Sequence, residues 1–310
     1  MMGSGRTVRI GVHPYNLSLL VLKLRDTLPG QLAAIGRDVE WVEFEDGRCT
    51  IDLIGDDTID LGGSGSVPPI LAQAERLPVV YLAASAPRPR HGVLVTRRGS
   101  GITGVADLAG RSVALMDGSF HTDVLARALD EVGLSYRGLD VVDGLVDEGM
   151  DRFLAGEVDA WLGNDPYLES VRSALGADLV DVLESGALTS NRSIWYAATG
   201  FVESEPAAVD IVLSALRESD RAIAADPAAA AALLAAAGIG DADATTWDTT
   251  LRNRSWQVLP VTAEIVAEQQ DAADRYLRHG IIDRAITVAE AVAPTAASLR
   301  AAGHAPAGTA

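Results

Sequence analysis

Long hydrophobic runs are absent from this sequence of 310 residues. The longest, residues 79–84 and 228–237, fall well short of the roughly 18 apolar residues that a membrane-spanning helix requires. With 48% hydrophobic and 22% charged residues, the chain can still bury a sizeable core. We therefore expect a globular protein of one large domain or two lobes, without a transmembrane segment.

Positive charge is scarce. The 25 Lys and Arg residues face 43 Asp and Glu residues, which leaves a net charge of −18. Such a chain repels phosphate backbones and anionic lipid, and no cluster of basic and aromatic residues offsets this locally. Nucleic acid is therefore not an expected partner.

Cysteine occurs once, at Cys49, so no intrachain disulfide can form. The N-terminal residues run directly into the strand-like segment 8–12, without the apolar core of a signal peptide. Two locations stay open. The protein is cytoplasmic if the chain is complete, and periplasmic or extracytoplasmic if a leader has been removed.

Strand-like apolar runs alternate with helix-length segments over the first two thirds of the chain, a pattern typical of βα units around mostly parallel sheets. The last third is predicted to be helical over residues 206–225, 227–237 and 262–279. The chain from about residue 294 is rich in Ala and Gly, and we expect it to be frayed. The predicted strands are residues 8–12, 39–43, 59–62, 79–83, 92–96, 112–115, 139–142, 160–162, 179–182 and 193–198.

Two extended stretches, residues 87–90 and 191–198, are interpreted as crossings between lobes. Residues 1–89 and 194–310 then form a first, discontinuous lobe that carries both termini. Residues 90–193 form an inserted second lobe. The cleft between two such lobes is the default place for a ligand.

A turn rich in small residues follows the third predicted strand. It contains Gly63, Ser64, Gly65 and Ser66, and two prolines follow. We expect Ser66 to cap the next helix, with the prolines in its first turn. Free backbone amides and the dipole at such a helix start attract anions.

The second lobe contains a similar turn after residues 112–115, made by Gly118, Ser119, Phe120 and His121 before a helix over residues 122–132. Two turns with bare amides facing one cleft would hold an oxyanion with neutral donors. A protein of net charge −18 could thus bind an anion. The alternative is that both are ordinary βα turns, in which Gly and Ser are common for backbone reasons.

Further candidates lie at the carboxyl end of the first strand, where ligands of open α/β sheets bind. His13, Tyr15 and Asn16 occupy this loop, and His13 could donate to a ligand oxygen or act as an acid or base. A surface histidine in a turn is the alternative. Four more candidates for the cleft are Trp161, Asp165, Tyr167 and Trp195, although such aromatic residues often belong to the core.

Cys49 is the one candidate nucleophile. Adjacent Arg48 and a helix start would lower the pKa of its thiol, but no matching base is visible, and an inert thiol is the alternative. The sequence has no metal-ligand spacing, phosphate loop, nucleophile elbow or dinucleotide fingerprint. No cofactor or metal is expected.

Several stretches together resemble the solute-binding proteins of ABC transporters for aliphatic sulfonates, taurine and nitrate. They are residues 8–11, 40–44, 60–73, 105–114, 156–161, 165–168 and 263–280. The resemblance implies a type II periplasmic-binding-protein fold, α/β and two-lobed, with an oxyanion in the cleft. It implies ligand contacts from residues 13–16, 63–66 and 118–121. The segment Gly65-Ser66-Val67-Pro68-Pro69 and Cys49 depart from the family pattern.

The chain is more distantly similar to the aryl-sulfinate desulfinases, through residues 191–200 and above all Trp195. That family uses a Cys, a His and an Arg. Here His13-Pro14 stands where the nucleophilic Cys would be, Cys49 lies near the His position, and Asp60 replaces the Arg. Desulfinase chemistry by that mechanism is therefore not carried over.

The leading hypothesis is a monomer that binds a small organic sulfonate or related oxyanion and delivers it to an ABC permease. The rival is a cytosolic lyase or hydrolase in which Cys49 and His13 face each other across the cleft. A cytosolic binding module with a regulatory or biosynthetic role is a third reading. The fold alone does not choose among them.

Overall fold

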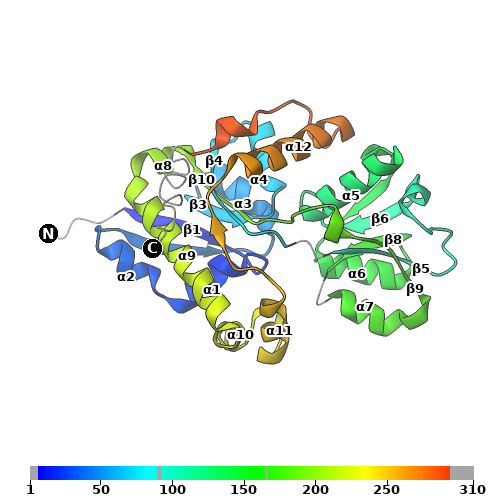
Figure 1. Cartoon of the computed structure of the whole chain (residues 1–310), viewed down its shortest axis with the longest axis horizontal. Helices are drawn as coiled ribbons and strands as arrows, with labels where there is room; N and C mark the ends of the chain where they lie inside the picture. The colour runs from blue at the N-terminus through cyan, green and yellow to red at the C-terminus, as the bar shows by residue number, and fades with distance from the viewer. Residues whose placement is uncertain (1–5, 89–91, 165–166, 294–310) are drawn as a thin grey trace, which may run out of the picture. The chain divides into compact units, whose positions relative to one another are not determined.

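The computed structural model describes residues 6–88, 92–164 and 167–293. They form two compact units, which Figure 1 shows with their element labels. The first contains residues up to 86, 192–268 and those from 287. The second contains residues 87–191 and 269–286. Residues 269–286, which the sequence analysis grouped with the first lobe, thus belong to the second unit.

The first unit is built on a six-stranded sheet in the order β11-β4-β10-β3-β1-β2. Buried aliphatic residues, among them Val8 and Ile10 of β1, anchor this sheet in the core. The strands are β1 (Thr7–Val12), β2 (Asp38–Glu43), β3 (Leu61–Ser64), β4 (Val79–Ser85), β10 (Ile194–Ala198) and β11 (Val258–Leu259). The helices are α1 (Leu17–Arg25), α2 (Leu28–Ala33), α3 (Thr50–Gly55), α4 (Pro68–Ala74), α8 (Thr199–Ser204), α9 (Pro206–Ala225), α10 (Pro227–Ala236) and α11 (Ala244–Arg252).

The second unit has a five-stranded sheet in the order β7-β6-β8-β5-β9. In Figure 1, α5 lies on one side of this sheet and α6 and α7 lie on the other. The strands are β5 (Val93–Arg97), β6 (Ser112–Leu115), β7 (Asp140–Asp143), β8 (Ala160–Gly163) and β9 (Leu179–Glu184). The helices are α5 (Phe120–Val132), α6 (Val146–Ala155), α7 (Tyr167–Leu175) and the second part of α12 (Ala263–His279).

The predicted α/β class is confirmed, and each predicted strand is present with its ends within two residues of the expected ones. Most strands of each sheet share one direction, as expected, but each sheet also contains an inserted strand that runs the other way. Strands β1, β2 and β3 run parallel, as do β6, β7 and β8. However, β10 enters the first sheet antiparallel between β3 and β4, and β5 lies antiparallel between β8 and β9. Strand β5 follows the crossing predicted at residues 87–90, and β10 lies within the crossing predicted at residues 191–198.

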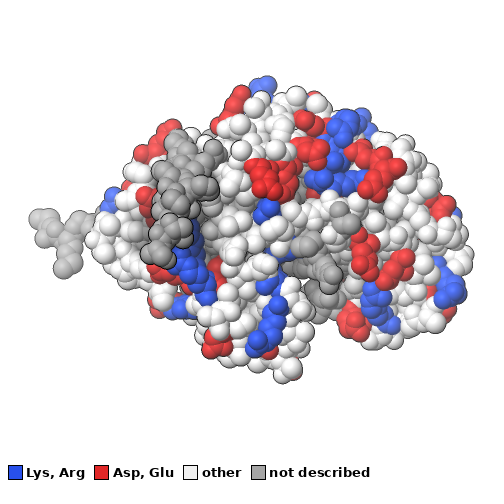
Figure 2. All heavy atoms as spheres, viewed as in Figure 1, with Lys and Arg blue, Asp and Glu red and all other residues white. Residues whose placement is uncertain are grey.

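The structure shows where the charged residues lie and whether any helix could span a membrane. On the face drawn in Figure 2, basic side chains lie in small groups, many of them beside acidic ones. Within the described ranges, no helix is both long enough and apolar enough to cross a bilayer. The expected fraying from residue 294 and the crossing at residues 89–90 lie outside the described residues.

Candidate functional site

Gly63 in β3 is the point where several polar side chains of the first unit converge. It lies opposite Trp195 of β10 in the antiparallel ladder. A Cβ atom built on Gly63 would lie 2.5 Å from Nδ2 of Asn16 and 2.9 Å from Nε1 of Trp195. Only a residue without a side chain lets these two nitrogens approach the strand so closely.

Asn16 is the N-cap of α1, and this role uses only half of its amide. Its Oδ1 accepts a hydrogen bond from the backbone N–H of Leu19 at 3.3 Å. Nδ2 is buried and has no hydrogen-bond partner among the described residues. Capping thus fixes the side chain and leaves an N–H donor beside Gly63.

The indole of Trp195 is 1% exposed and packs into the hydrophobic core of the first unit. Its Nε1 also lacks a partner within the described chain. Buried polar groups in folded proteins are almost always hydrogen-bonded. Asn16 Nδ2 and Trp195 Nε1 are two unpartnered N–H donors beside one glycine, and an external acceptor would satisfy both.

His13, in the loop after β1, completes this group and is 3% exposed. Its Nε2 lies 2.8 Å from the carbonyl oxygen of Gly63, whereas Nδ1 has no partner among the described residues. Burial lowers the pKa of His13 to about 4, against smaller opposing effects of the Gly63 carbonyl and Asp46. The ring is therefore neutral at pH 7. We call His13, Asn16, Gly63 and Trp195 the Gly63 cluster.

The small residues after Gly63 take different roles. Ser64 donates to the carbonyl of Gly65 at 3.1 Å and shares a 2.9 Å hydrogen bond with the hydroxyl of Tyr196, so its Oγ is engaged. The backbone amides of Gly65 and Ser66 make no hydrogen bond to the rest of the described chain. They remain candidate donors next to the Gly63 cluster.

The prediction that Ser66 caps a helix is wrong. Helix α4 begins one residue later, with Val67 at its N-cap and the two prolines at its first positions. Val67 has no side-chain donor or acceptor, and proline has no N–H, so this start offers little to an anion. Anion recognition here cannot rest on the dipole of α4, which has only seven residues.

In the second unit, the turn at Gly118 does not present bare amides, contrary to expectation. The N–H of Gly118 donates to Oδ1 of Asp117 at 3.0 Å and to Oγ1 of Thr122 at 2.8 Å. Ser119 caps α5 by accepting from the N–H of His121, and its own N–H donates to Met116. The backbone amides of Gly118, Ser119 and His121 are thus already engaged within the turn.

The imidazole of His121 is likewise engaged. Nδ1 accepts from the backbone N–H of Met116 at 3.2 Å, and Nε2 lies 3.2 Å from Oδ1 of Asn164. Phe120 packs edge-on against this ring. The predicted ligand contacts of residues 118–121 stay predictions.

The remaining aromatic and acidic candidates differ in exposure and in position. Tyr15 is 36% exposed, next to His13. Trp161 is fully buried and stacks on Phe153 in the core of the second unit, and its Nε1, like that of Trp195, has no partner among the described residues. Tyr167 begins α7. Asp165 lies outside the described residues.

Cys49 does not have the environment of an activated thiol. Burial and the carboxylates of Asp46 and Asp52 raise its pKa, and Arg48 opposes them only weakly because it pairs with Asp46 at 2.6 Å. The expected lowering of the thiol pKa is therefore wrong. His13 and Cys49 both belong to the first unit, so they do not face each other from two lobes.

Asp60, which stands where the desulfinases carry an arginine, has a structural role. Its carboxylate accepts from the backbone N–H and the guanidinium of Arg9, with contacts of 2.7 Å to each. Asp60 is 2% exposed, and this pair joins β3 to β1. The described residues also contain no group of three or more His, Cys, Asp or Glu placed to hold a metal ion.

Sequence reasoning identified the residues of the Gly63 cluster but not what joins them. It also missed Gly47, where an added Cβ would lie 2.3 Å from Cε1 of His13. In the sequence, only the glycines at positions 47 and 63 indicate that other groups pack closely against the backbone there. The contacts themselves depend on strand pairing over long separations.

The two α/β units and their sheets match solved structures of the periplasmic-binding-protein fold. The alkanesulfonate-binding protein SsuA from Xanthomonas axonopodis pv. citri, solved with bound MOPS, has a TM-score of 0.81 and 26% identity, covering 94% of this chain and 99% of that one. The desulfurization enzyme DszB has a TM-score of 0.65 and 16% identity over 96% of this chain and 100% of its own, a likeness of fold alone. The chain therefore has the periplasmic-binding-protein fold.

Sequence comparison then gives the family. The model of the NMT1/THI5-like family matches residues 32–230. A protein of Escherichia coli K12 named as an aliphatic sulfonates-binding protein is 30% identical over 292 residues, which are 93% of this chain and 89% of that protein. The chain belongs to the NMT1/THI5-like family.

Proposed function

We propose that this protein binds the acid group of a small organic sulfonate at the Gly63 cluster and delivers it to an ABC permease. The single observation that carries the proposal is the pair of buried, unpartnered donors, Asn16 Nδ2 and Trp195 Nε1, beside Gly63. A sulfonate oxygen accepts hydrogen bonds and donates none, so it complements both. The names of the relatives support the same ligand class.

Neutral donors suit the charge of this chain. A cationic side chain at the site would be drawn to some of the 43 carboxylates, whereas amide and indole N–H groups hold an anion by oriented dipoles. Distant carboxylates act through water and salt and are screened beyond about 10 Å. A net charge of −18 is therefore compatible with anion binding.

All residues of the Gly63 cluster come from one chain, so the proposed site needs no residue from a second copy, and we propose that the protein acts as a monomer. Tyr15, next to His13, is proposed as a secondary contact. The contacts predicted for residues 118–121 stay predictions, which a Ser119→Ala variant tests by its effect on affinity.

Titration calorimetry tests the proposal, with methane-, ethane- and arylsulfonates, taurine and sulfinates as ligands. The decisive variant is Asn16→Ser, because serine still caps α1 but lacks the amide donor. We expect its affinity for a sulfonate to fall about tenfold, the loss of one hydrogen bond to a charged group. Asn16→Ala should lower affinity to a similar extent and also destabilise the chain by about 1 kcal/mol.

The matched control is Asp243→Ser, a cap substitution at α11, where Asp243 accepts from the N–H of Thr246. It should leave sulfonate affinity unchanged. If no ligand of the series gives heat or a thermal shift with the unaltered chain, the proposed function is wrong.

A further inference from the structure

The hydrogen bond between His13 and Gly63 fixes which nitrogen of the imidazole carries the proton. A carbonyl oxygen can only accept, so Nε2 at 2.8 Å from it must be the donor. In the neutral ring the other nitrogen, Nδ1, is then a bare acceptor. Nδ1 is buried without a partner in the described part of the chain.

The ring has little freedom to exchange the two nitrogens. One edge lies against Gly47, where an added Cβ would approach Cε1 to 2.3 Å, Nε2 to 2.7 Å and Nδ1 to 2.8 Å. The rings of Phe44 and Tyr15 lie at 5.4 Å and 6.1 Å from the imidazole, centre to centre. These contacts leave the ring little room to move, and the hydrogen bond to the carbonyl of Gly63 favours the orientation with Nε2 toward it.

The charges around His13 are few. Asp46 is the carboxylate that acts on it, and Asp46 is itself paired with Arg48. Phe44, Gly47 and Gly63, which also contact the ring, are uncharged. The phenol of Tyr15 is the other titratable group beside the ring. Burial outweighs the attraction of Asp46, so the neutral ring with its acceptor at Nδ1 is the form present at pH 7.

The Gly63 cluster therefore offers a mixed set of unpartnered atoms. Asn16 Nδ2 and Trp195 Nε1 are donors, and His13 Nδ1 is an acceptor. A plain alkanesulfonate brings acceptors only and leaves Nδ1 buried without a hydrogen bond, which is unfavourable. A sulfonate with a nearby hydroxyl or ammonium group can satisfy all three.

We propose that His13 makes this site selective for sulfonates that carry a hydrogen-bond donor close to the acid group. This inference rests on the proposed function and adds the chemical class of the ligand. His13 acts as a specificity-determining residue through the lone pair of Nδ1. The anion itself is held by the neighbouring N–H donors.

The test compares matched ligands on the full chain at pH 7. Ethanesulfonate is paired with 2-hydroxyethanesulfonate, and methanesulfonate with hydroxymethanesulfonate, by titration calorimetry. We expect at least one hydroxylated ligand to bind about tenfold more tightly than its partner. In His13→Phe, which keeps an aromatic ring but has no acceptor, this ratio should fall to about one. In His13→Gln, which retains both a donor and an acceptor, a preference should persist.

Failure of the inference is distinct from failure of the proposed function. If none of these four ligands binds, and none of the arylsulfonates, taurine and sulfinates of the first series does either, the proposed function is wrong. If they bind but the hydroxyl gives no advantage, or the same advantage remains in His13→Phe, the inference is wrong. Nitrogen-15 NMR of the His13 ring gives a readout that does not depend on folding of the variants. The Nε2-protonated neutral form should persist with ligand bound, and an imidazolium formed on binding ethanesulfonate would overturn the inference.

Discussion

Trp195 lies directly opposite Gly63 in the antiparallel ladder, and its indole crosses the space that a side chain at position 63 would need. An added Cβ would lie 2.5 Å from Cδ1 of Trp195 and equally close to Nδ2 of Asn16. The strand pairing of β3 and β10 thus sets the geometry of the two donors. The pairing of β3 with β10 brings Trp195 to Gly63, and the pairing of β3 with β1 brings the loop that contains Asn16 there.

Gly63→Ala is expected to weaken sulfonate binding strongly, because the new methyl group must displace Asn16, Trp195 or both. Overpacking of this kind costs about 1–3 kcal/mol of the free energy of unfolding. Denaturant unfolding and calorimetry with the best sulfonate ligand would measure the two effects. Retained affinity in a folded Gly63→Ala protein would show that the ligand binds elsewhere.

A matched control is Gly30→Ala in α2, where an added Cβ has no neighbour within 4 Å. Alanine is the better helix former, so stability should rise by about 0.5–1 kcal/mol. Affinity should stay the same. The pair of variants separates a general effect of losing a glycine from the particular contacts of Gly63.

The buried neutral His13 should make stability depend on pH. Its pKa is about 4 in the folded chain and 6.5 in an unfolded one, so between these values the unfolded state binds a proton that the folded state does not. Stability is therefore fully present above pH 6.5 and falls as the pH drops toward 4, by about 3 kcal/mol from this residue. Urea unfolding of the unaltered chain and of His13→Gln at pH 7.5, 6 and 4.5 measures the difference. Parallel pH profiles for the two proteins would contradict the assignment.

Local patterns in the sequence predicted the strands well because buried strands are apolar runs bounded by turn residues. The direction of β10 was not predictable in this way. It depends on the chain returning to the first sheet after more than a hundred residues, which no local pattern records. The same holds for the Gly63 cluster, since Asn16 and Trp195 meet only through the register of β3 with its neighbours.

The two turns rich in Gly and Ser show the other limit of sequence reasoning. They are similar as sequences, yet the amide of Gly118 is satisfied by Asp117 and Thr122, whereas Gly65 and Ser66 have no such neighbours. Whether an amide is free depends on which side chains compete for it. Spacing alone does not decide that competition.

Cys49 is expected to be a slow thiol. Its raised pKa leaves a smaller fraction of thiolate at pH 7.5 than an unstructured cysteine has, so iodoacetamide should label it more slowly than a cysteine-containing peptide. The rate should increase with pH up to the raised pKa. Cys49→Ser should leave sulfonate affinity unchanged. Labelling faster than the peptide, with protection by ligand, would instead revive the enzymatic hypothesis.

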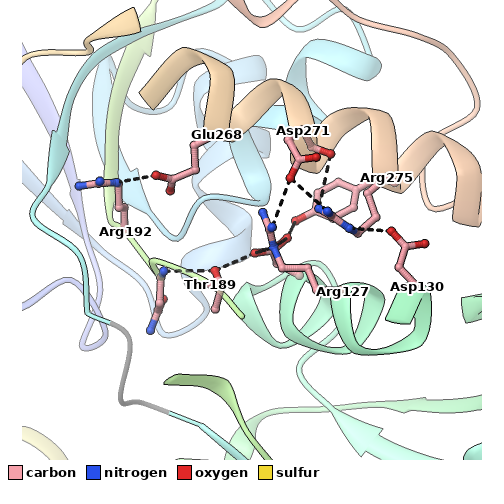
Figure 3. Close-up of polar contacts among 10 residues, drawn as sticks. Arg127, Asp130, Thr189, Arg192, Glu268, Asp271 and Arg275 are labelled. Atoms are coloured by element: carbon pink, nitrogen blue, oxygen red, sulfur yellow. Dashed lines mark hydrogen bonds and ion pairs between the residues drawn. The ribbon is translucent and has the colours of Figure 1, made fainter. Parts of the chain in front are cut away.

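Asp123 should be the most sensitive polar residue of the second unit. It is 2% exposed and accepts from Thr189 Oγ1 at 2.7 Å, from the hydroxyl of Tyr276 at 3.1 Å and from Arg127 at 3.0 Å. Further ion pairs join α5 to α12 in the same region. Figure 3 shows Arg127 paired with Asp271 and Arg275 paired with Asp130.

Asp123→Asn removes the negative charge and leaves Arg127 only partly compensated. Breaking a buried ion pair in this way costs about 3–5 kcal/mol. Amide hydrogen exchange should show the loss first in residues 269–279 of α12, because Tyr276 is held directly by Asp123. Asp248→Asn, at the solvent-facing pair with Arg252 on α11, is the control and should leave exchange in α12 unchanged. If Asp123→Asn is as stable as the unaltered chain, the contacts of Asp123 with Arg127 and Tyr276 do not contribute to the free energy of unfolding, and the prediction is wrong.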